Sequence, residues 1–467
     1  MALWMIWWNV VRGLRPAFSR KRTFLWFCVS LAGTCIRSDL AGVSSIVRSL
    51  GLKGKYYDRL LDMFHSNAID LDYLAQLWTS IMMKVLEPFL MRANGRIVLL
   101  ADGIKIAKSG KKMPGVKKLH QTSDSNTKPQ YIFGHSCQSI ALVVKAGLSQ
   151  FALPLCCKIH EGAVFSNRDK RTLLDKLITL IYSLNINTSF LLIADAYYTS
   201  KKIIEPLLAA KDHLISGVKS NAVAYLPSLA SSKKTRGRPR IYGKKLTLKN
   251  LFNDLSLFST VESPIYGEKK VFMQVRTIDL LWKPVGVTVR FILCIHPTRG
   301  RKILLSTDTA LSALEIIELY GVRFKIEVSY KQAIYSVGTY SYHFWMQVMK
   351  PRPRTSGNQY LHRESGQYRN LVRRKLRAYH CHMQLGVIAQ GILNCLAVLK
   401  PEMIWRSFGS WLRTIRPGIP PSEKVVACAL RNSFPDFLMN CPEKHTLAKF
   451  IQDRIDRERA EGLRLTG

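Results

Sequence analysis

Two aspartates follow buried, strand-like runs, and a glutamate lies in a later helical stretch. Asp102 closes the apolar run of residues 96–101, and Asp195 closes the run of residues 189–194. Glu327 lies in a helix that the residue spacing predicts over 312–333. Carboxylates at strand ends, beside a carboxylate on a packing helix, suit Mg²⁺ with its waters and phosphate oxygens. Two such ions about 4 Å apart promote phosphodiester displacement, which is the chemistry that these residues predict.

The same helical stretch carries two cations and a phenol near the glutamate. Tyr320, Arg323, Glu327 and Lys331 are spaced three, four and four residues apart, so they share one helix face. Arginine and lysine there can hold phosphate groups. The alternative is a surface helix with ordinary ion pairs four residues apart. The two strand-end aspartates and the charge of the chain favour a metal- and phosphate-binding site over this alternative.

Other acids and histidines compete for the same role. Asp308 also follows a strand-like run and is the main rival to the three acids. Asp124 lies in a basic loop, where we expect a solvated side chain. His120 and His135 could orient a substrate, although we expect structural roles for both.

The chain is strongly basic for its length. It has 467 residues, with 70 Lys and Arg against 31 Asp and Glu, and a net charge of +39. Such a surface predicts a polyanionic partner, with nucleic acid ahead of an anionic membrane, and argues against a small neutral substrate. Basic segments lie at 105–118, 233–245 and 350–377. Within the second, Arg236, Arg238 and Arg240 resemble a minor-groove arm, and phosphate contact is the simpler interpretation.

The helices and strands that must position these residues are predicted from the spacing of apolar residues along the chain. Residues 1–95 have helical spacing. Strands are expected at 96–103, 131–145, 151–159, 189–195 and 214–218, and helices at 171–184 and 200–210. The pattern breaks over 222–300 into antiparallel strands. A strand at 302–308, the 312–333 helix, an apolar helix at 379–400 and a helical tail complete the chain.

Two features bear on the cellular setting. A basic flank and fourteen apolar residues, 23–36, imitate a signal peptide, but they are too few for a membrane span of about 20 residues. We therefore interpret them as a buried helix. The ten cysteines form no Cys-x-x-Cys pair, which predicts buried free thiols in a reducing cytoplasm.

At this point the sequence resembles the DDE transposases of bacterial insertion sequences. The resemblance rests on Val98–Gly103, on Leu191–Asp195, and on Tyr320–Glu327, which matches the signature Tyr, two residues, Arg, three residues, Glu. It implies an α/β fold, with an RNase H-like mixed-sheet core split by a β-rich insertion, and helical N- and C-terminal regions. It also implies that Asp102, Asp195 and Glu327 bind the metal, with Tyr320 and Arg323 near the DNA backbone. One departure is Ile334, at the position of the signature lysine, so that Lys331 is the substitute.

The resemblance divides the chain into five parts. These are a helical N-terminal DNA-binding region (1–95), the first part of the core (96–221), the β-rich insertion (222–300), the second part with the catalytic helix (301–400), and a helical tail (401–467).

The implied activity is metal-dependent cleavage at the ends of an insertion sequence, followed by strand transfer into target DNA. The implied cofactors are two Mg²⁺ ions, with Mn²⁺ as an alternative. The implied partners are double-stranded DNA with terminal inverted repeats, target DNA and a second copy of the chain on paired ends. We expect no membrane, and a location in the bacterial cytoplasm at the nucleoid. The alternatives are a nuclease or resolvase without strand transfer, and a non-catalytic DNA-binding protein such as a decayed copy.

Overall fold

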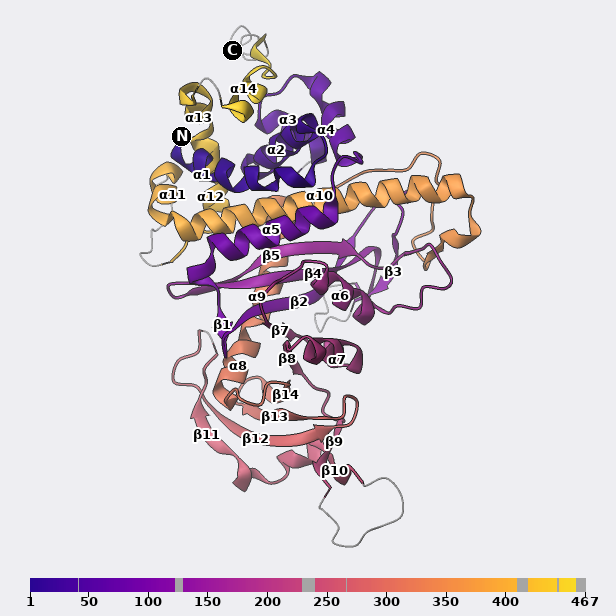
Figure 1. Cartoon of the computed structure of the whole chain (residues 1–467), viewed down its shortest axis with the longest axis vertical. Coiled ribbons are helices and arrows are strands. Elements are labelled where there is room, and N and C mark those ends of the chain that lie inside the picture. Colours follow the sequence, from indigo (N-terminus) through magenta and orange to yellow (C-terminus); the bar gives the residue numbers. More distant parts are fainter. Residues whose placement is uncertain are drawn as a thin grey trace.

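A computed structural model describes residues 1–40, 42–121, 129–228, 240–265, 267–409, 419–442 and 445–458. Asp124, Arg236 and Arg238 lie outside the described residues. The elements are stacked along one long axis (Figure 1). Helices from both ends of the chain occupy one end, a long helix crosses below them, a sheet lies in the middle, and a β-rich part forms the other end.

Five strands form the core of the sheet. They are β2 (Arg96–Ala107), β4 (Tyr131–Ala146), β5 (Ser149–Ile159), β7 (Phe190–Ala194) and β8 (His213–Gly217). Their spatial order is β5-β4-β2-β7-β8, in which β2, β7 and β8 are parallel and β4 is antiparallel to both β2 and β5. This is the strand order of an RNase H-like core, so the predicted fold class is confirmed.

Helices cover both faces of the parallel strands, which explains why those strands are apolar without alternation. On one face, α6 (Leu173–Tyr182) and α7 (Lys201–Ala209) share a core with Leu99 and Leu192. On the other, α8 (Ala313–Val322) and α9 (Phe324–Gln332) pack with Leu100 and Ile193. Successive residues of each strand therefore belong to different cores.

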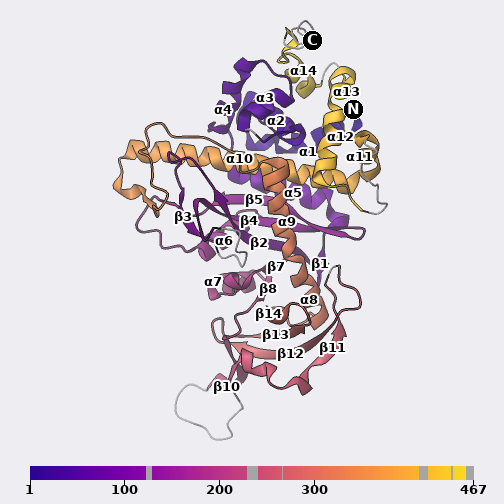
Figure 2. The same ribbon diagram turned by 180° about the vertical axis from the view of Figure 1, so that it is seen from behind.

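The segment between the two parts of the core extends the same sheet. Its strands are β9 (Val223–Pro227), β10 (Tyr242–Thr247), β11 (Ser259–Glu262), β12 (Phe272–Trp282), β13 (Val287–His296) and β14 (Gly300–Ser306). Strand β14 pairs antiparallel with β13 on one side and with β8 on the other. The insertion is thus joined to the core by backbone hydrogen bonds, and the view from behind shows α8 passing beside it (Figure 2).

The helices from the two chain ends pack together. The N-terminal set is α1 (Ala2–Val11), α2 (Lys21–Ile36), α3 (Gly42–Ser49), α4 (Tyr57–Phe64) and α5 (Leu71–Val85). The C-terminal set is α10 (Gly366–Leu399), α11 (Pro401–Phe408), α12 (Glu423–Asn432), α13 (Phe434–Asn440) and α14 (Thr446–Gln452). Trp4 joins them, because its indole Nε1 donates to the Leu430 carbonyl at 3.1 Å and its ring stacks on Phe437.

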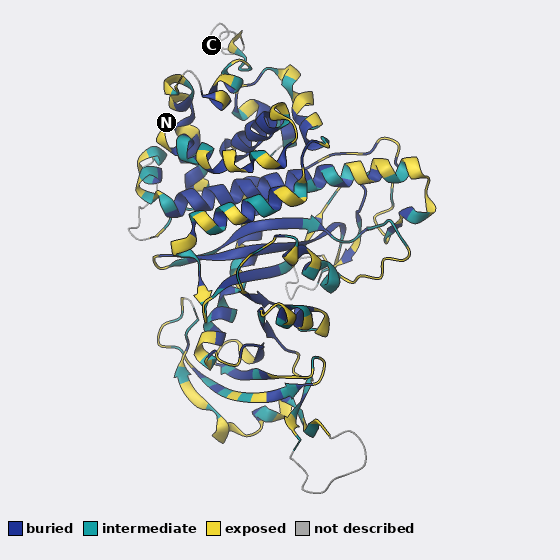
Figure 3. Cartoon of the chain, viewed as in Figure 1, coloured by how far each residue is buried: buried dark blue, intermediate teal, exposed yellow. Residues whose placement is uncertain are grey.

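Burial explains the two apolar helices that resemble membrane or signal segments. Residues 24–36 of α2 are all buried, as predicted (Figure 3). Helix α10 is long and apolar enough to cross a membrane, but 94% of its apolar window is buried inside the protein. It begins at Gly366, not near Tyr379 as predicted, because its basic first half is rich in good helix formers and Ser365 caps it. All ten cysteines are free thiols, and eight are buried.

Four short strands complete the described sheets: β1 (Arg92–Ala93), β3 (Lys117–His120), β6 (Ala163–Val164) and β15 (Gln359–Tyr360). Strand β15 pairs with β6 and so holds the basic segment before α10 against the core.

Candidate functional site

Strand register brings the two predicted aspartates together. In the parallel pair β2–β7, Leu100 lies opposite Ile193. The same offset, carried two residues further, places Asp102 beside Asp195. Both residues have the strand parity of Leu100 and Ile193, whose side chains pack under α8 and α9. The two carboxylates therefore lie on the face of the sheet that carries Glu327.

The two aspartates reach this position in different ways. Asp195 follows the last residue of β7, as predicted, and its Oδ1 accepts from the Tyr197 amide at 3.0 Å. Asp102 was predicted to end its strand, and this is wrong, because β2 continues to Ala107. The continuation is stabilised by β4, which pairs with β2 beyond the end of β7, with Ser139 opposite Asp102.

Arg323 lies between the acid of the sheet and the acid of the helix. Its Nη2 is 2.9 Å from Oε1 of Glu327, and its Nη1 is 3.6 Å from Oδ2 of Asp102. Burial disfavours the charged guanidinium, but the charges of Tyr320, Glu327 and Asp102 raise its pKa. Arg323 was predicted to contact phosphate. In this arrangement its partners are the two carboxylates.

The electrostatics of Asp102 reflect its neighbours. The pKa of Asp102 is raised to about 6, mainly by burial, and the negative charges of Asp195 and Glu327 act in the same direction. The Gly103 amide, which donates to its Oδ1 at 2.7 Å, and Arg323 oppose this shift. Three acids are thus close enough to repel one another, with one cation among them.

The remaining predicted residues lie around this group in different ways. Tyr320 is half-buried on α8, and its hydroxyl lies against Gly217. A Cβ at that position would be only 3.0 Å from the hydroxyl, so the glycine leaves room for the tyrosine. The Lys302 ammonium is 5.4 Å from the centre of the Tyr320 ring. Lys331 is exposed on α9 and makes no ion pair in the described part of the chain. Arg240 is in the insertion, beside β10, and donates to the Tyr242 carbonyl at 2.8 Å.

The predicted single helix over 312–333 is divided at Arg323. The Arg323 amide bonds the Tyr320 carbonyl and the Ile326 amide bonds the Arg323 carbonyl, so the helix tightens from four-residue to three-residue hydrogen bonds. Arg323 therefore lies at the junction of α8 and α9.

Two tyrosines near the acids were not predicted. The Tyr330 hydroxyl donates to the Asp102 backbone carbonyl at 2.9 Å, and Tyr198 is buried close enough for the Asp102 charge to raise its pKa. Each follows an acid by three residues, Glu327 and Asp195 respectively. That helical spacing is the signal that could have identified them.

The rival residues have structural contacts. Asp308 accepts from Arg96 at 2.8 Å and from Asn94 at 3.0 Å. Because β14 runs antiparallel to β8, its end lies at the start of the parallel strands, the opposite edge from Asp195. His135 is buried between the Tyr342 hydroxyl and the Pro114 carbonyl, at 2.8 and 2.9 Å. The carbonyl of exposed His120 accepts from Lys105.

The donor set has the chemistry of a divalent-cation site, although its present arrangement is not one. Among the residues that the structure describes, no three His, Cys, Asp or Glu side chains are grouped tightly enough to hold a metal ion. The three acids are hard oxygen donors, the kind that Mg²⁺ prefers. Arg323 provides the positive charge that this group otherwise lacks.

Together, an RNase H-like sheet and carboxylates on β2, at the end of β7 and on α9 define a nuclease-type α/β core. Comparison with protein families identifies which one: the profile of the DDE superfamily endonucleases matches residues 13–257, more than half of the chain. The chain belongs to this family. The matched segment contains Asp102 and Asp195 but ends before Glu327.

Other comparisons add little. No curated protein sequence matches the chain. Among solved structures, it is similar to a piggyBac transposase in a synaptic complex with hairpin DNA, at 12% identity and a TM-score of 0.39. That similarity covers 93% of this chain and 75% of the transposase chain. The family assignment rests on the sequence profile.

Proposed function

We propose that the chain is a DNA transposase of a bacterial insertion sequence, which cleaves phosphodiester bonds at the element ends and transfers the freed strands into target DNA. The observation that carries the proposal is the β2–β7 register, which places Asp102 beside Asp195 under the helix of Glu327. The signature spacing of Tyr320, Arg323 and Glu327 supports it.

Asp102, Asp195 and Glu327 would hold two Mg²⁺ ions, with Mn²⁺ as an alternative. Bound divalent ions supply activation of an attacking oxygen and stabilisation of charge on the leaving oxygen. On this proposal Arg323 exchanges its carboxylate partners for a DNA phosphate, since its guanidinium fork fits both. Tyr320 supports Arg323 from α8, and Lys331 is a second cation on α9.

The charge of the chain supports DNA as the partner, because a net charge of +39 is stabilised by a polyanion. Arg236, Arg238 and Arg240 would contact DNA from the insertion. We further propose a homodimer on paired ends, and a location at the nucleoid in the bacterial cytoplasm. The helical region 1–95 would bind DNA, and the core parts 96–221 and 301–400 would carry the chemistry.

The test is cleavage of DNA that carries the sequences flanking the coding region. Asp195→Asn and Glu327→Gln should each abolish Mg²⁺-dependent cleavage while DNA binding in EDTA is retained. Glu318→Gln is the matched control, because it removes an acid from α8 away from the carboxylate group. Cleavage by Asp195→Asn at the wild-type rate would refute the assignment of the acids.

A nuclease or resolvase without strand transfer is the second candidate. It is favoured by the family description, which names an endonuclease and nothing further. Incubation of labelled end DNA with a target plasmid separates the two. Joined products support the transposase, and nicks alone support the nuclease.

A non-catalytic, decayed copy is the third reading. The presence of all three acids argues against it, and it would be supported if the wild-type chain bound DNA but never cleaved it.

A further inference from the structure

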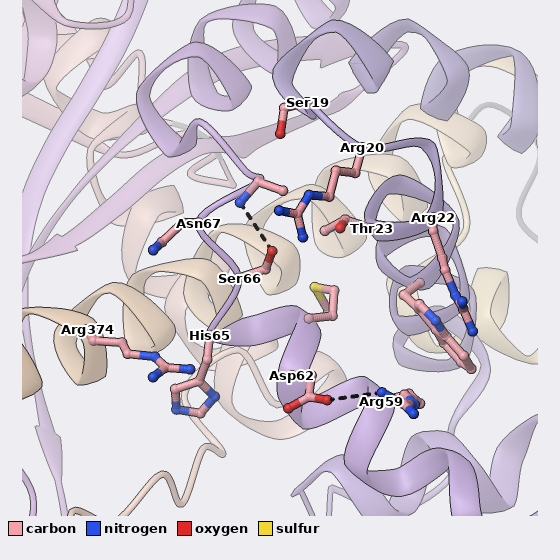
Figure 4. Close-up of a pocket in the computed structure, with 13 residues that line it drawn as sticks. Ser19, Arg20, Arg22, Thr23, Arg59, Asp62, His65, Ser66, Asn67 and Arg374 are labelled. Carbon is pink, nitrogen blue, oxygen red and sulfur yellow. Dashed lines mark hydrogen bonds and ion pairs between the residues drawn. The ribbon is translucent and has the colours of Figure 1, made fainter.

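A hollow of about 660 Å³ lies in the helical end of the molecule, where three elements meet (Figure 4). Its walls come from the start of α2, from the end of α4 with the turn after it, and from the basic first half of α10. None of its lining residues belongs to the acidic group on β2, β7 and α9.

The lining of this hollow is basic. Four arginines border it against one acid, Asp62; they are Arg20, Arg22, Arg59 and Arg374. Arg59 forms an ion pair with Asp62 at 3.7 Å, so the charges of these two residues neutralise each other. The other three are exposed, and none has an ion-pair partner among the residues described here. Three positive charges, from the start of α2 and from α10, therefore border the hollow with no ion pair to any described residue.

The N-terminus of α2 lies at the hollow and adds to its positive charge. Helix α2 has 16 residues, no acid in its first turn and no side chain that caps its first amides. The N-terminus of a helix carries a partial positive charge and unpaired N–H groups, which are suited to an anion. Thr23, Ser66 and Asn67 also line the hollow and offer neutral hydrogen-bond donors.

The walls are fixed relative to one another. Arg377 of α10 donates to the Ile69 carbonyl, and Lys375 lies 3.0 Å from Nε2 of His65. On the other side, the Ser19 amide bonds the Ala68 carbonyl at 3.0 Å. Burial lowers the pKa of His65, and the charges of Lys375 and Arg374 act in the same direction.

We propose that this hollow is a second nucleic-acid contact, in which Arg20, Arg22 and Arg374 bind backbone phosphates of double-stranded DNA away from the acidic group. The inference rests on the proposed function and deepens it. Duplex DNA is the source of phosphate that the structure favours, because the three arginines are exposed and the chain as a whole carries a net charge of +39, which suits a polyanion. Contacts of this kind fix the position of DNA without reading its sequence.

The test is duplex binding as a function of salt, measured by fluorescence anisotropy with a labelled oligonucleotide. EDTA is present, and Asp195→Asn is the background for every protein, so that cleavage plays no part. The variant combines Arg20→Gln, Arg22→Gln and Arg374→Gln. Each lost phosphate contact should reduce the slope of log K against log salt by about 0.9. The affinity ratio between 50 and 200 mM salt should then fall by about 3.5-fold per contact.

The matched control removes the same charge from exposed positions outside residues 1–95 that do not line the hollow, with Lys400→Gln, Lys424→Gln and Lys449→Gln. It should leave the slope nearly unchanged. Because all six side chains are exposed, both variants should fold, which circular dichroism verifies. The three arginine substitutions should weaken binding of a duplex with a scrambled sequence by the same factor, because the proposed contact is to the backbone.

The outcomes separate this inference from the proposed function. If the Asp195→Asn protein does not bind duplex DNA, the proposed function fails. If it binds and the arginine variant keeps its slope, the hollow is not a DNA contact. A further arm measures the melting temperature with inorganic phosphate. A phosphate-dependent rise that the arginine variant loses, without a change in duplex binding, would assign the hollow to free phosphate and overturn the inference.

Discussion

Asp308 offers a direct test of the distinction between the acids that hold the fold and the acids that do chemistry. Its carboxylate is 7% exposed and lies 2.8 Å from Arg96, which is 21% exposed. Asn94 and the Ala310 amide also donate to it. Although burial alone would raise the pKa of Asp308, these hydrogen bonds and the charges of His213 and Arg96 lower it overall.

Replacement of Asp308 by asparagine leaves Arg96 charged and without its carboxylate in a mostly buried place, where its Nε already has no partner among the described residues. Breaking a buried pair in this way costs about 3–5 kcal/mol of unfolding free energy. We expect a loss near the lower end of that range at pH 7, because asparagine keeps one oxygen for Asn94 or the amide.

The effect of pH has a definite sign. A folded-state pKa below the unfolded value means that the ionised carboxylate stabilises the fold above about pH 4, and that this contribution is lost as pH falls through the folded pKa. The difference between wild type and Asp308→Asn in urea unfolding should therefore shrink under acid. The Arg96→Gln and double variants complete a double-mutant cycle, whose coupling energy isolates the pair.

Cleavage by Asp308→Asn, measured below its melting temperature, should stay near the wild-type level, since Asp308 lies at the edge of the sheet opposite Asp195. An undiminished stability together with a loss of cleavage would refute this reasoning and restore Asp308 as a catalytic acid.

Three further perturbations test the surroundings of the site. In EDTA at pH 7.5, Asp102→Asn should raise the unfolding free energy by up to about 3 kcal/mol, because a folded-state pKa of about 6 makes the ionised acid costly; a drop in urea stability would contradict this. Tyr330→Phe should cost about 1 kcal/mol through the lost bond to the Asp102 carbonyl, and an unchanged urea midpoint would show that the bond contributes nothing. Gly162→Ala should lower soluble yield and melting temperature sharply, since the new Cβ would meet the Gly115 carbonyl oxygen at 1.8 Å and φ is +93°, and normal yield would argue against that contact.

The sequence predicted the elements of the core well, because the parallel strands are buried on both faces and leave short apolar runs. The same runs and the helical spacing also singled out Asp102, Asp195 and Glu327, whose role in catalysis stays a prediction. The extension of β2 past Asp102 was missed because it depends on β4, a distant segment that no local pattern reveals. The earlier start of α10 was a local signal that was overlooked, because Ser365 caps the amide of Tyr368, three residues further along.

The position of Arg323 shows the same limit. Its spacing from Glu327 was visible in the sequence, and a phosphate contact followed from chemistry alone. Only the packing of α9 on β2 shows that, without DNA, the guanidinium lies against Asp102 as well as Glu327. The hollow between α2, α4 and α10 could not be predicted either, because Arg374 lies far from Arg20 and Arg22 in the sequence.

The pairing of β14 with β8 has a consequence for the order in which the protein can assemble during synthesis. Asp102 and Asp195 emerge from the ribosome with the strands that position them, but Glu327 follows only after the whole insertion. Strand β14 pairs with β8 just before α8 begins. The β8 edge of the first core part therefore stays unpaired until the insertion has been synthesised. The nascent chain therefore lacks its third acid until the sheet is closed, so an incomplete copy is unable to assemble the carboxylate group.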